Sequence, residues 1–314
     1  MRKIEEVFVN GICLKDILDK HKKWVDKEED GERANLSFAD LSLVDLSFVN
    51  LFDASLKDTN LSHANLSHAN LRNTDLSHAD LTGSDLTRAN LSHANLRNTD
   101  LSFVNLKTAN LNEADLSSAN LHEANLKGAY LINAKLRYAN LREANLICVD
   151  SFNADLSHTD LAYANLIGTD LRNADLSCAN LIGANLSNAK LSNAILNDIA
   201  YNVLTTSFNL QCPEKGSFIG YKKADKKIVE LLITEDAKRS SATTRKCRCN
   251  KAKVLSITNI GNTVEYKEAH SDFNYSFVYR VGEVVEVKDF DEDRWKECST
   301  GIHFFLTRGE AVNY

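Results

Sequence analysis

Proline is nearly absent from this 314-residue chain, which contains a single one, Pro213. Because proline interrupts helices and strands, its place between two regions of different composition indicates a linker. Long apolar runs are also lacking, and none approaches the roughly twenty residues that a bilayer-spanning helix needs, so we expect no membrane span. The seven cysteines are scattered and odd in number, and no signal-peptide pattern opens the sequence. We therefore expect free thiols and a cytoplasmic protein.

A strong excess of positive charge is lacking too. The net charge is −6. Residues 1–33 carry 8 basic and 9 acidic side chains, residues 34–200 carry 11 and 18, and residues 201–314 carry 18 and 16. The C-terminal region is barely basic, which argues against a nucleic acid partner.

What the sequence does contain is a five-residue repeat from Ala34 to Ile199. Stepping by five from Leu36 to Leu196 gives thirty-three positions, of which thirty-two are Leu and one is Ser151. A small residue, mostly Ala, stands two places before each position. A period of five fits neither a helix nor a strand. It fits a square coil of four short sides that closes after twenty residues, so that roughly eight coils stacked at about 4.8 Å form a rod.

The motif A(D/N)LxX, as in Ala34-Asn35-Leu36 and Ala79-Asp80-Leu81, resembles that of the pentapeptide repeat family. Asn and Asp suit it because their side chains satisfy backbone groups at turns. The resemblance implies an all-β right-handed quadrilateral β-helix, a solenoid of about eight coils, over residues 34–200. It also implies an alternative function, because quinolone-resistance members of the family mimic B-DNA and bind DNA gyrase. The small negative excess of the repeats, with arginines interspersed, makes a poor phosphate mimic.

Residues 1–33 are expected to form an N-terminal helical cap. A cap is needed because an open coil end exposes strand-edge N–H and C=O groups. The apolar residues of the expected helix are Ile12, Leu14, Ile17, Leu18 and Trp24, and Gly31 breaks it.

Two groups of outward apolar residues form the candidate interaction surface. The first group lies on the first coil, and we expect the capping helix to cover it, with a partner-binding patch as the alternative. The second group is expected to meet either the C-terminal domain or a second copy of the chain in a homodimer. The first group is Phe38, Leu43, Phe48 and Phe52, and the second includes Tyr130, Ile132, Ile147, Phe152 and Ile167. Separately, Asn133, Asn153, Asn173 and Asn193 fall in register and predict a structural Asn ladder.

The chain changes character after the repeats. Residues 201–210 are expected to be a C-terminal cap and linker, and residues 211–314 a smaller α+β domain. The segments Phe218–Lys222 and Cys298–Phe305 resemble an uncharacterised domain that follows pentapeptide repeats in bacterial and viral proteins, which implies no activity. Expected strands are 217–221, 227–234, 253–258, 263–267, 277–281, 284–287 and 302–306, with a short helix from residue 307.

The segment 238–251 of this domain is rich in basic and hydroxyl side chains, which could hold a phosphate-like anion. The interpretation that we favour is a solvated, salt-bridged strand and turn that faces the acidic residues 289–293. The end of the chain, Gly301–Tyr314, is also faintly similar to a segment of poly-ADP-ribosyltransferases in which His303 replaces a Tyr, although their upstream His-Gly motif is not found. The candidate ligand-binding residues are Arg239, Ser240, Ser241, Arg245, Arg248 and His303.

Only one close cysteine pair, Cys247 and Cys249, is present, whereas a structural zinc site usually shows two, so we expect neither metal nor cofactor. The sequence therefore predicts a non-catalytic interaction scaffold, in which a rigid rod presents a C-terminal binding domain to a protein partner of unknown identity. Two alternatives stay open: a gyrase-binding DNA mimic, and a nucleotide- or NAD-binding enzyme in the C-terminal domain.

Overall fold

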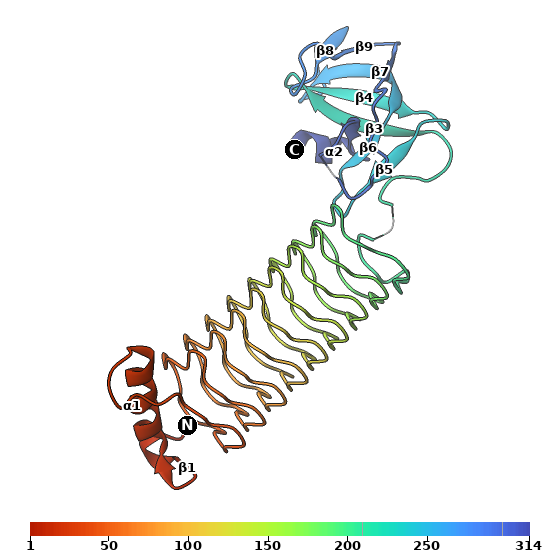
Figure 1. Ribbon diagram of the computed structural model, residues 1–314. Helices are drawn as coiled ribbons and strands as arrows, with labels where there is room; N and C mark the ends of the chain where they lie inside the picture. The colour runs from red at the N-terminus through yellow and green to blue at the C-terminus, as the bar shows by residue number, and fades with distance from the viewer. Residues whose placement is uncertain (209, 297) are drawn as a thin grey trace. The chain divides into compact units, whose positions relative to one another are not determined.

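A computed structural model describes residues 1–208, 210–296 and 298–314. The chain forms two compact units, Met1–Thr206 and Ser207–Tyr314, and the boundary lies inside the segment 201–210 that the sequence assigns to a cap and linker. Figure 1 shows the coil in the first unit and short sheets in the second. None of the helices in the described part of the chain has the length and apolar character needed to cross a bilayer.

The first unit is a stack of four-sided coils. Each residue that precedes an inward Leu bridges in parallel to the residue one coil later, as Asn35 does to Ser55. The N–H of the Leu donates to that same residue, so that Leu36 N lies 2.8 Å from the Ser55 oxygen. The ladder continues to Asn185, whose bridge to Thr206 takes one residue more than the regular spacing. This slip falls where the repeat decays after Ile199.

Each side of the coil ends in a corner with left-handed backbone. The residue two places after the Leu has φ near +60°, from 62° at Phe38 to 54° at Asp198. The next N–H returns to the Leu carbonyl, as Ala39 does to Leu36 at 3.1 Å, which is the hydrogen bond of a β-turn with positive φ at its third residue. A side chain costs about 1 kcal/mol in this conformation. Burial of one Leu per side, worth about 2 kcal/mol, offsets that cost.

The interior of the coil is filled by Leu and small side chains. Hydroxyls that replace Ala there are satisfied, since Thr59 Oγ1 donates to the Leu36 carbonyl at 2.8 Å and Thr99 Oγ1 to the Leu76 carbonyl at 3.0 Å. Ser151 is 1% exposed at its Leu position. Its N–H still donates to the Asp170 carbonyl at 2.8 Å, so the exception does not shift the phase of the coil.

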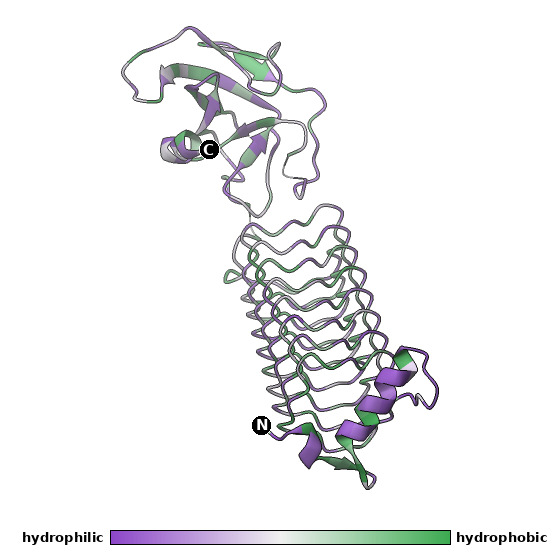
Figure 2. Cartoon of the chain, turned by 90° about the vertical axis from the view of Figure 1, so that its left-hand side faces the viewer, coloured by the Kyte–Doolittle hydropathy of each residue, from purple (hydrophilic) through white to green (hydrophobic). Residues whose placement is uncertain are grey.

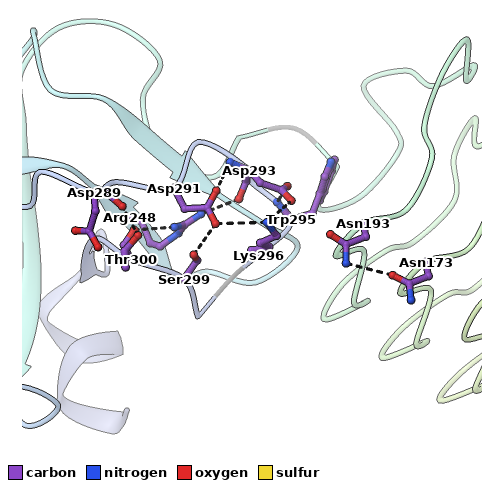
Figure 3. Close-up of polar contacts among 10 residues, drawn as sticks. All are labelled: Asn173, Asn193, Arg248, Asp289, Asp291, Asp293, Trp295, Lys296, Ser299 and Thr300. Atoms are coloured by element: carbon purple, nitrogen blue, oxygen red, sulfur yellow. Dashed lines mark hydrogen bonds and ion pairs between the residues drawn. The ribbon is translucent and has the colours of Figure 1, made fainter.

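The outward Asn residues link successive coils. Asn60 Nδ2 donates to Asp40 Oδ1 in the preceding coil at 3.2 Å. In the predicted Asn ladder, Asn153 donates to Asn133 at 2.8 Å, and Asn193 donates to Asn173 at 3.2 Å (Figure 3). The prediction is confirmed for these two pairs, and their role is structural.

The first coil is capped by N-terminal elements: the 3₁₀ helix η1 (Ile4–Glu6), the hairpin of β1 (Phe8–Val9) and β2 (Ile12–Cys13), and helix α1 (Leu14–Val25). Figure 1 places α1 across the end of the coil, and Figure 2 shows its mixture of hydrophilic and hydrophobic residues. Leu14, Leu18 and His21 form its buried face. In addition, the Arg2 backbone pairs with the exposed edge of the first coil at Val44.

The expectation that the capping helix covers the outward apolar residues of the first coil is wrong. Phe38 is 77% exposed, Leu43 50% and Phe48 73%, whereas Phe52 is half-buried. The three exposed residues occupy left-handed corners, which point away from the coil axis, while α1 lies across the coil end. The Phe48 ring instead stacks on the ring of His68, and the two ring centres lie 4.6 Å apart.

The stability that the N-terminal cap gives to the first unit should depend on pH because of His21. This side chain is fully buried, and its Nδ1 accepts the Ala34 N–H at 3.1 Å. Burial, followed by the charge of Arg33, lowers the pKa of His21 below its usual 6.5. The unfolded chain therefore binds a proton that the folded chain does not, and stability should fall as the pH drops below 6.5, by at most about 1.4 kcal/mol per pH unit. Thermal unfolding of the first unit at pH 5 and pH 7.5 measures this slope.

The control for this prediction is an exposed histidine. We expect His21→Phe to flatten the slope between pH 5 and 6.5, and His78→Phe, at an exposed corner, to leave it unchanged. An identical slope in all three proteins would show that His21 does not control the pH dependence.

The second unit contains two antiparallel sheets, a hairpin and a helix. The four-stranded sheet has the order β10-β7-β4-β3, the three-stranded sheet the order β11-β6-β5, and β8 pairs with β9. Backbone bonds of 2.8 Å in both directions between Tyr221 and Phe305 link the two sheets. The bounds are β3 (Phe218–Ala224), β4 (Lys227–Ile233), β5 (Arg239–Ser241), β6 (Cys247–Cys249), β7 (Lys251–Asn259), β8 (Glu268–His270), β9 (Val278–Arg280), β10 (Val284–Glu286), β11 (Ile302–Phe304) and α2 (Arg308–Asn313).

Six of the seven expected strands overlap observed ones, and the expected final helix forms. The strand expected at 263–267 is wrong, since only Glu265 forms a bridge, to Thr258. The Asn259 side chain accepts the N–H groups of Thr263 at 2.8 Å and Val264 at 3.1 Å, which closes a turn at this point. Strands β5, β6 and β8 were not expected from the sequence.

Candidate functional site

Two of the three arginines of the basic segment, Arg239 and Arg248, donate to backbone carbonyls of their own domain. Arg239 lies on β5, and its guanidinium donates to five carbonyls, including that of Gly216 at 2.9 Å. Arg248 lies on β6 and is 2% exposed. It donates to the carbonyls of Thr300 at 2.9 Å and Asp293 at 2.8 Å, as Figure 3 shows. These contacts hold loops to the sheet.

The other candidates of the segment do not converge with the arginines. Ser240 is 3% exposed, and its Oγ has no hydrogen-bond partner among the described residues. Ser241 Oγ accepts the Gln211 N–H at 2.8 Å, and Arg245 forms an exposed ion pair with Glu310. The segment does face residues 289–293, through an ion pair of Lys238 with Glu292 and the Arg248 contacts. The structural interpretation therefore accounts for it, although its strands are buried rather than solvated.

The nearby cysteines belong to the hydrophobic core. Cys212, Cys247 and Cys249 are at most 3% exposed. Burial raises the pKa of Cys249 to about 12, and a hydrogen bond with Cys212 together with burial raises that of Cys247. Both therefore remain thiols rather than thiolates. Within residues 1–208, 210–296 and 298–314, no three His, Cys, Asp or Glu side chains are grouped so as to hold a metal ion.

A cleft of about 910 Å³ opens in the second unit, lined by residues of β3, the β8–β9 hairpin region, residues 286–289 and 298–303, and the C-terminal end. Of the six candidates, only His303 lines it. The cleft is both basic and aromatic, as is usual where a few polar groups orient a ligand between apolar walls. Its basic side chains are Lys222, Lys223, Lys246, Lys288 and His303, its acidic ones Asp272, Glu286 and Asp289, and its aromatic ones Phe273, Phe277, Tyr279, Phe305 and Tyr314.

Lys222 is the unusual residue of this cleft. It alternates along β3 with half-buried residues, so it takes an inward position between Gly220 and Ala224, and it is 9% exposed. Its Nζ lies 6.0 Å from the centre of the Tyr279 ring. No hydrogen bond or ion pair joins this ammonium to any residue that the structure describes. Burial lowers the pKa of Lys222 to about 8, against the opposing charge of Asp272.

The sequence interpretation passed over Lys222, although a signal was present. In Phe218-Ile-Gly-Tyr-Lys-Lys-Ala224 the inward places of an alternating strand are taken by Gly220, Lys222 and Ala224. A lysine at a core-facing place needs a partner, because burying an unpaired charge is costly. That conflict marks a functional-site candidate.

Lys246 adds a second cation to the same cleft. Its Nζ donates to the Tyr314 hydroxyl at 3.0 Å and lies 5.0 Å from the centre of that ring. Tyr279 is 2% exposed, and burial raises its pKa, so its hydroxyl stays protonated at neutral pH. The arrangement can hold an anion against aromatic walls.

The second group of outward apolar residues on the rod is only partly exposed to solvent. Tyr130 is 49% exposed, and the others of the group are half-buried. The Arg172 guanidinium lies 5.7 Å from the centre of the Phe152 ring and is held there by a pair of bonds to Asp170 of 2.8 and 2.6 Å. These residues remain candidates for an interaction surface.

The twenty-residue ladder, with Leu inside and a turn at every fifth residue, defines a quadrilateral repeat solenoid. Residues 32–150 and 154–193, just over half of the chain, match the pentapeptide repeats (8 copies), and the chain belongs to the pentapeptide repeat family. Residues 208–311 match a family of unknown function (DUF5758). Both matches confirm the resemblances seen in the sequence.

Several solved structures are similar to this chain. HetL, a pentapeptide repeat protein involved in heterocyst differentiation regulation in the cyanobacterium Nostoc sp. strain PCC 7120, is 33% identical over 57% of this chain and 92% of its own, with a TM-score of 0.29. The pentapeptide repeat protein alr5209 of Nostoc is 33% identical over 34% of this chain and 83% of its own, with a TM-score of 0.29. QnrB1, a plasmid-mediated fluoroquinolone resistance protein, is 16% identical over 55% and 92%, with a TM-score of 0.34. No match to this chain was found among curated proteins.

Proposed function

We propose that this protein is a non-catalytic interaction scaffold whose first coils bind a partner protein. The observation that carries the proposal is the exposure of Phe38, Leu43 and Phe48, which is 77%, 50% and 73% at three successive corners of the first coil. Exposed aromatic residues on a rigid frame lose little conformational entropy on binding, and exposed apolar residues grouped on one coil mark a candidate interaction site. The free thiols of all seven cysteines fit a reducing compartment such as the cytoplasm.

The DNA-mimic alternative has weaker support. The repeats carry 11 basic and 18 acidic side chains, and several acidic ones are already engaged, as Asp170 is by Arg172 and Lys190. A phosphate mimic needs a dense and uncompensated row of negative charge. The aromatic corners instead favour a protein partner that supplies an apolar surface.

A photo-crosslinking amino acid at Phe38 or Phe48 tests the scaffold proposal. Both positions should capture the same protein, and the matched polar corner Asn98 should not. With that partner purified, we expect Phe38→Ser together with Phe48→Ser to weaken binding by at least about tenfold. Unchanged affinity of the double variant, with the rod still folded, would contradict the proposal.

A further inference from the structure

We propose that the cleft of the second unit binds a small organic phosphate of the nucleotide class, with the phosphate paired to Lys222 and the flat ring against the aromatic walls. This site is separate from the aromatic corners of the rod and does not depend on the proposed scaffold function. The fold buries the charge of Lys222 without a partner among the described residues.

Lys222 is nine-tenths buried on the core-facing side of β3 and opens into the cleft. Its ammonium has no carboxylate within 4.0 Å among the described residues, in contrast to the half-buried Lys227 of β4, which pairs with Asp225 at 2.7 Å. With a pKa of about 8, about nine in ten molecules carry the charge at pH 7. A buried charge of this kind is destabilising unless it is paired. An anionic ligand would pair with the Lys222 ammonium and stabilise it.

The neighbouring charges set the kind of anion. Lys246 lies close enough to lower the Lys222 pKa, and Asp272 opposes it. The Asp272 carboxylate is itself engaged, because Oδ1 accepts the Asp225 N–H at 2.9 Å. Two lysines act as point charges, a donor type that binds phosphate. A phosphate monoester offers them a charge of about −1.5 to −2, which is more than the single charge of a carboxylate. The cleft therefore favours a phosphate.

The volume of the cleft and its aromatic walls indicate what the ligand carries besides the phosphate. A volume of about 910 Å³ is far larger than an inorganic ion needs and lies in the range of sites for organic ligands. Phe277 and Tyr279 lie edge to face at 5.3 Å, and Phe305 packs against Tyr314 at 5.1 Å. Aromatic faces of this kind stack on flat heterocycles. A nucleotide combines such a ring with a phosphate.

Isothermal titration of the full-length protein tests the site with the four nucleoside 5′-monophosphates as probes, and with the matching nucleosides and inorganic phosphate as controls. At least one monophosphate should bind with a Kd below about 1 mM, and its nucleoside and phosphate alone should bind at least about tenfold more weakly. If no monophosphate binds, or if phosphate alone binds as tightly, the proposal is overturned.

The variant that removes the charge is Lys222→Met, which keeps an unbranched side chain that is one atom shorter. It should weaken monophosphate binding by about 10- to 100-fold and raise the melting temperature of the ligand-free second unit, because it removes an unpaired buried charge. The matched control is Lys253→Met, an exposed lysine of β7 outside the cleft, which should change neither. Unaltered binding by Lys222→Met would overturn the proposal.

Proton uptake by the unaltered protein gives a second readout that needs no variant. At pH 8 about half of the Lys222 side chains are neutral, and a bound phosphate would favour the charged form. Titration in two buffers of different ionisation enthalpy should therefore show uptake of about half a proton per ligand. Binding without proton uptake at pH 8 would place the anion away from Lys222.

Discussion

Replacing Leu111 by Ala in the middle of the rod should lower the free energy of unfolding of the first unit by about 3 kcal/mol. The side chain is 0% exposed, and its equivalents one coil to either side, Leu91 and Leu131, are equally enclosed. The Leu111 N–H donates to the Tyr130 carbonyl at 2.8 Å, so the backbone on both sides of the new cavity is held in place. If the cavity cannot collapse, the side chains around it lose all of their contacts with the removed atoms, and the loss of stability is largest.

Urea unfolding followed by circular dichroism measures this loss. Because each coil contacts only its neighbours, a weakened central coil should also broaden the transition or divide it in two. The control is Glu113→Ala, two residues away at an exposed corner, where the side chain pairs with His93 at the surface. That change should stay within about 0.5 kcal/mol. A loss below about 1 kcal/mol for Leu111→Ala would show that the coil relaxes around the gap.

The rod could be predicted from sequence because its structure is local and repeated. Every fifth residue from Leu36 to Leu196 takes the same inward place on one side of a coil, so the same local structure is specified thirty-three times. The first corners could not be predicted in the same way. Whether Phe38 and Phe48 lie under α1 depends on where a separate helix packs, and no period in the sequence records that contact.

The second unit shows what pairing information the sequence does not contain. Arg239 and Arg248 were grouped as ligand donors because they are basic and close in sequence. In the fold their partners are backbone carbonyls up to 52 residues away, at Thr300 in the case of Arg248. Backbone acceptors are the same in every residue type, so no sequence pattern can point to them. Lys222 was detectable, since its conflict with an inward strand position is local.

Arg248 and Lys222 are both buried cations, and their partners distinguish their roles. The guanidinium of Arg248 has two carbonyls at 2.9 and 2.8 Å and a position 5.4 Å from the centre of the Phe290 ring. The ammonium of Lys222 has neither a hydrogen bond nor an ion pair in the described part of the chain. We infer that Arg248 stabilises the domain, whereas the charge of Lys222 costs stability until an anion binds.

Arg248→Ala should accordingly lower the free energy of unfolding of the second unit by about 4 kcal/mol. The variant removes a side chain that is 2% exposed and leaves the Thr300 and Asp293 carbonyls without their donors, each worth about 1 to 3 kcal/mol, in addition to the cavity. Because these two carbonyls lie in the segment between β10 and β11, that segment should loosen first. Calorimetry of the full-length protein should show a lower transition for the second unit and an unchanged one for the rod.

Arg245→Ala is the matched control from the same basic segment. Its ion pair with Glu310 is exposed on the arginine side, at 61%, and such pairs contribute about 1 kcal/mol or less. A stable Arg248→Ala domain that had lost nucleotide binding would contradict the structural role and return this arginine to the ligand site. Equal losses from both variants would also contradict it, because burial and the two carbonyl bonds are what set Arg248 apart from Arg245.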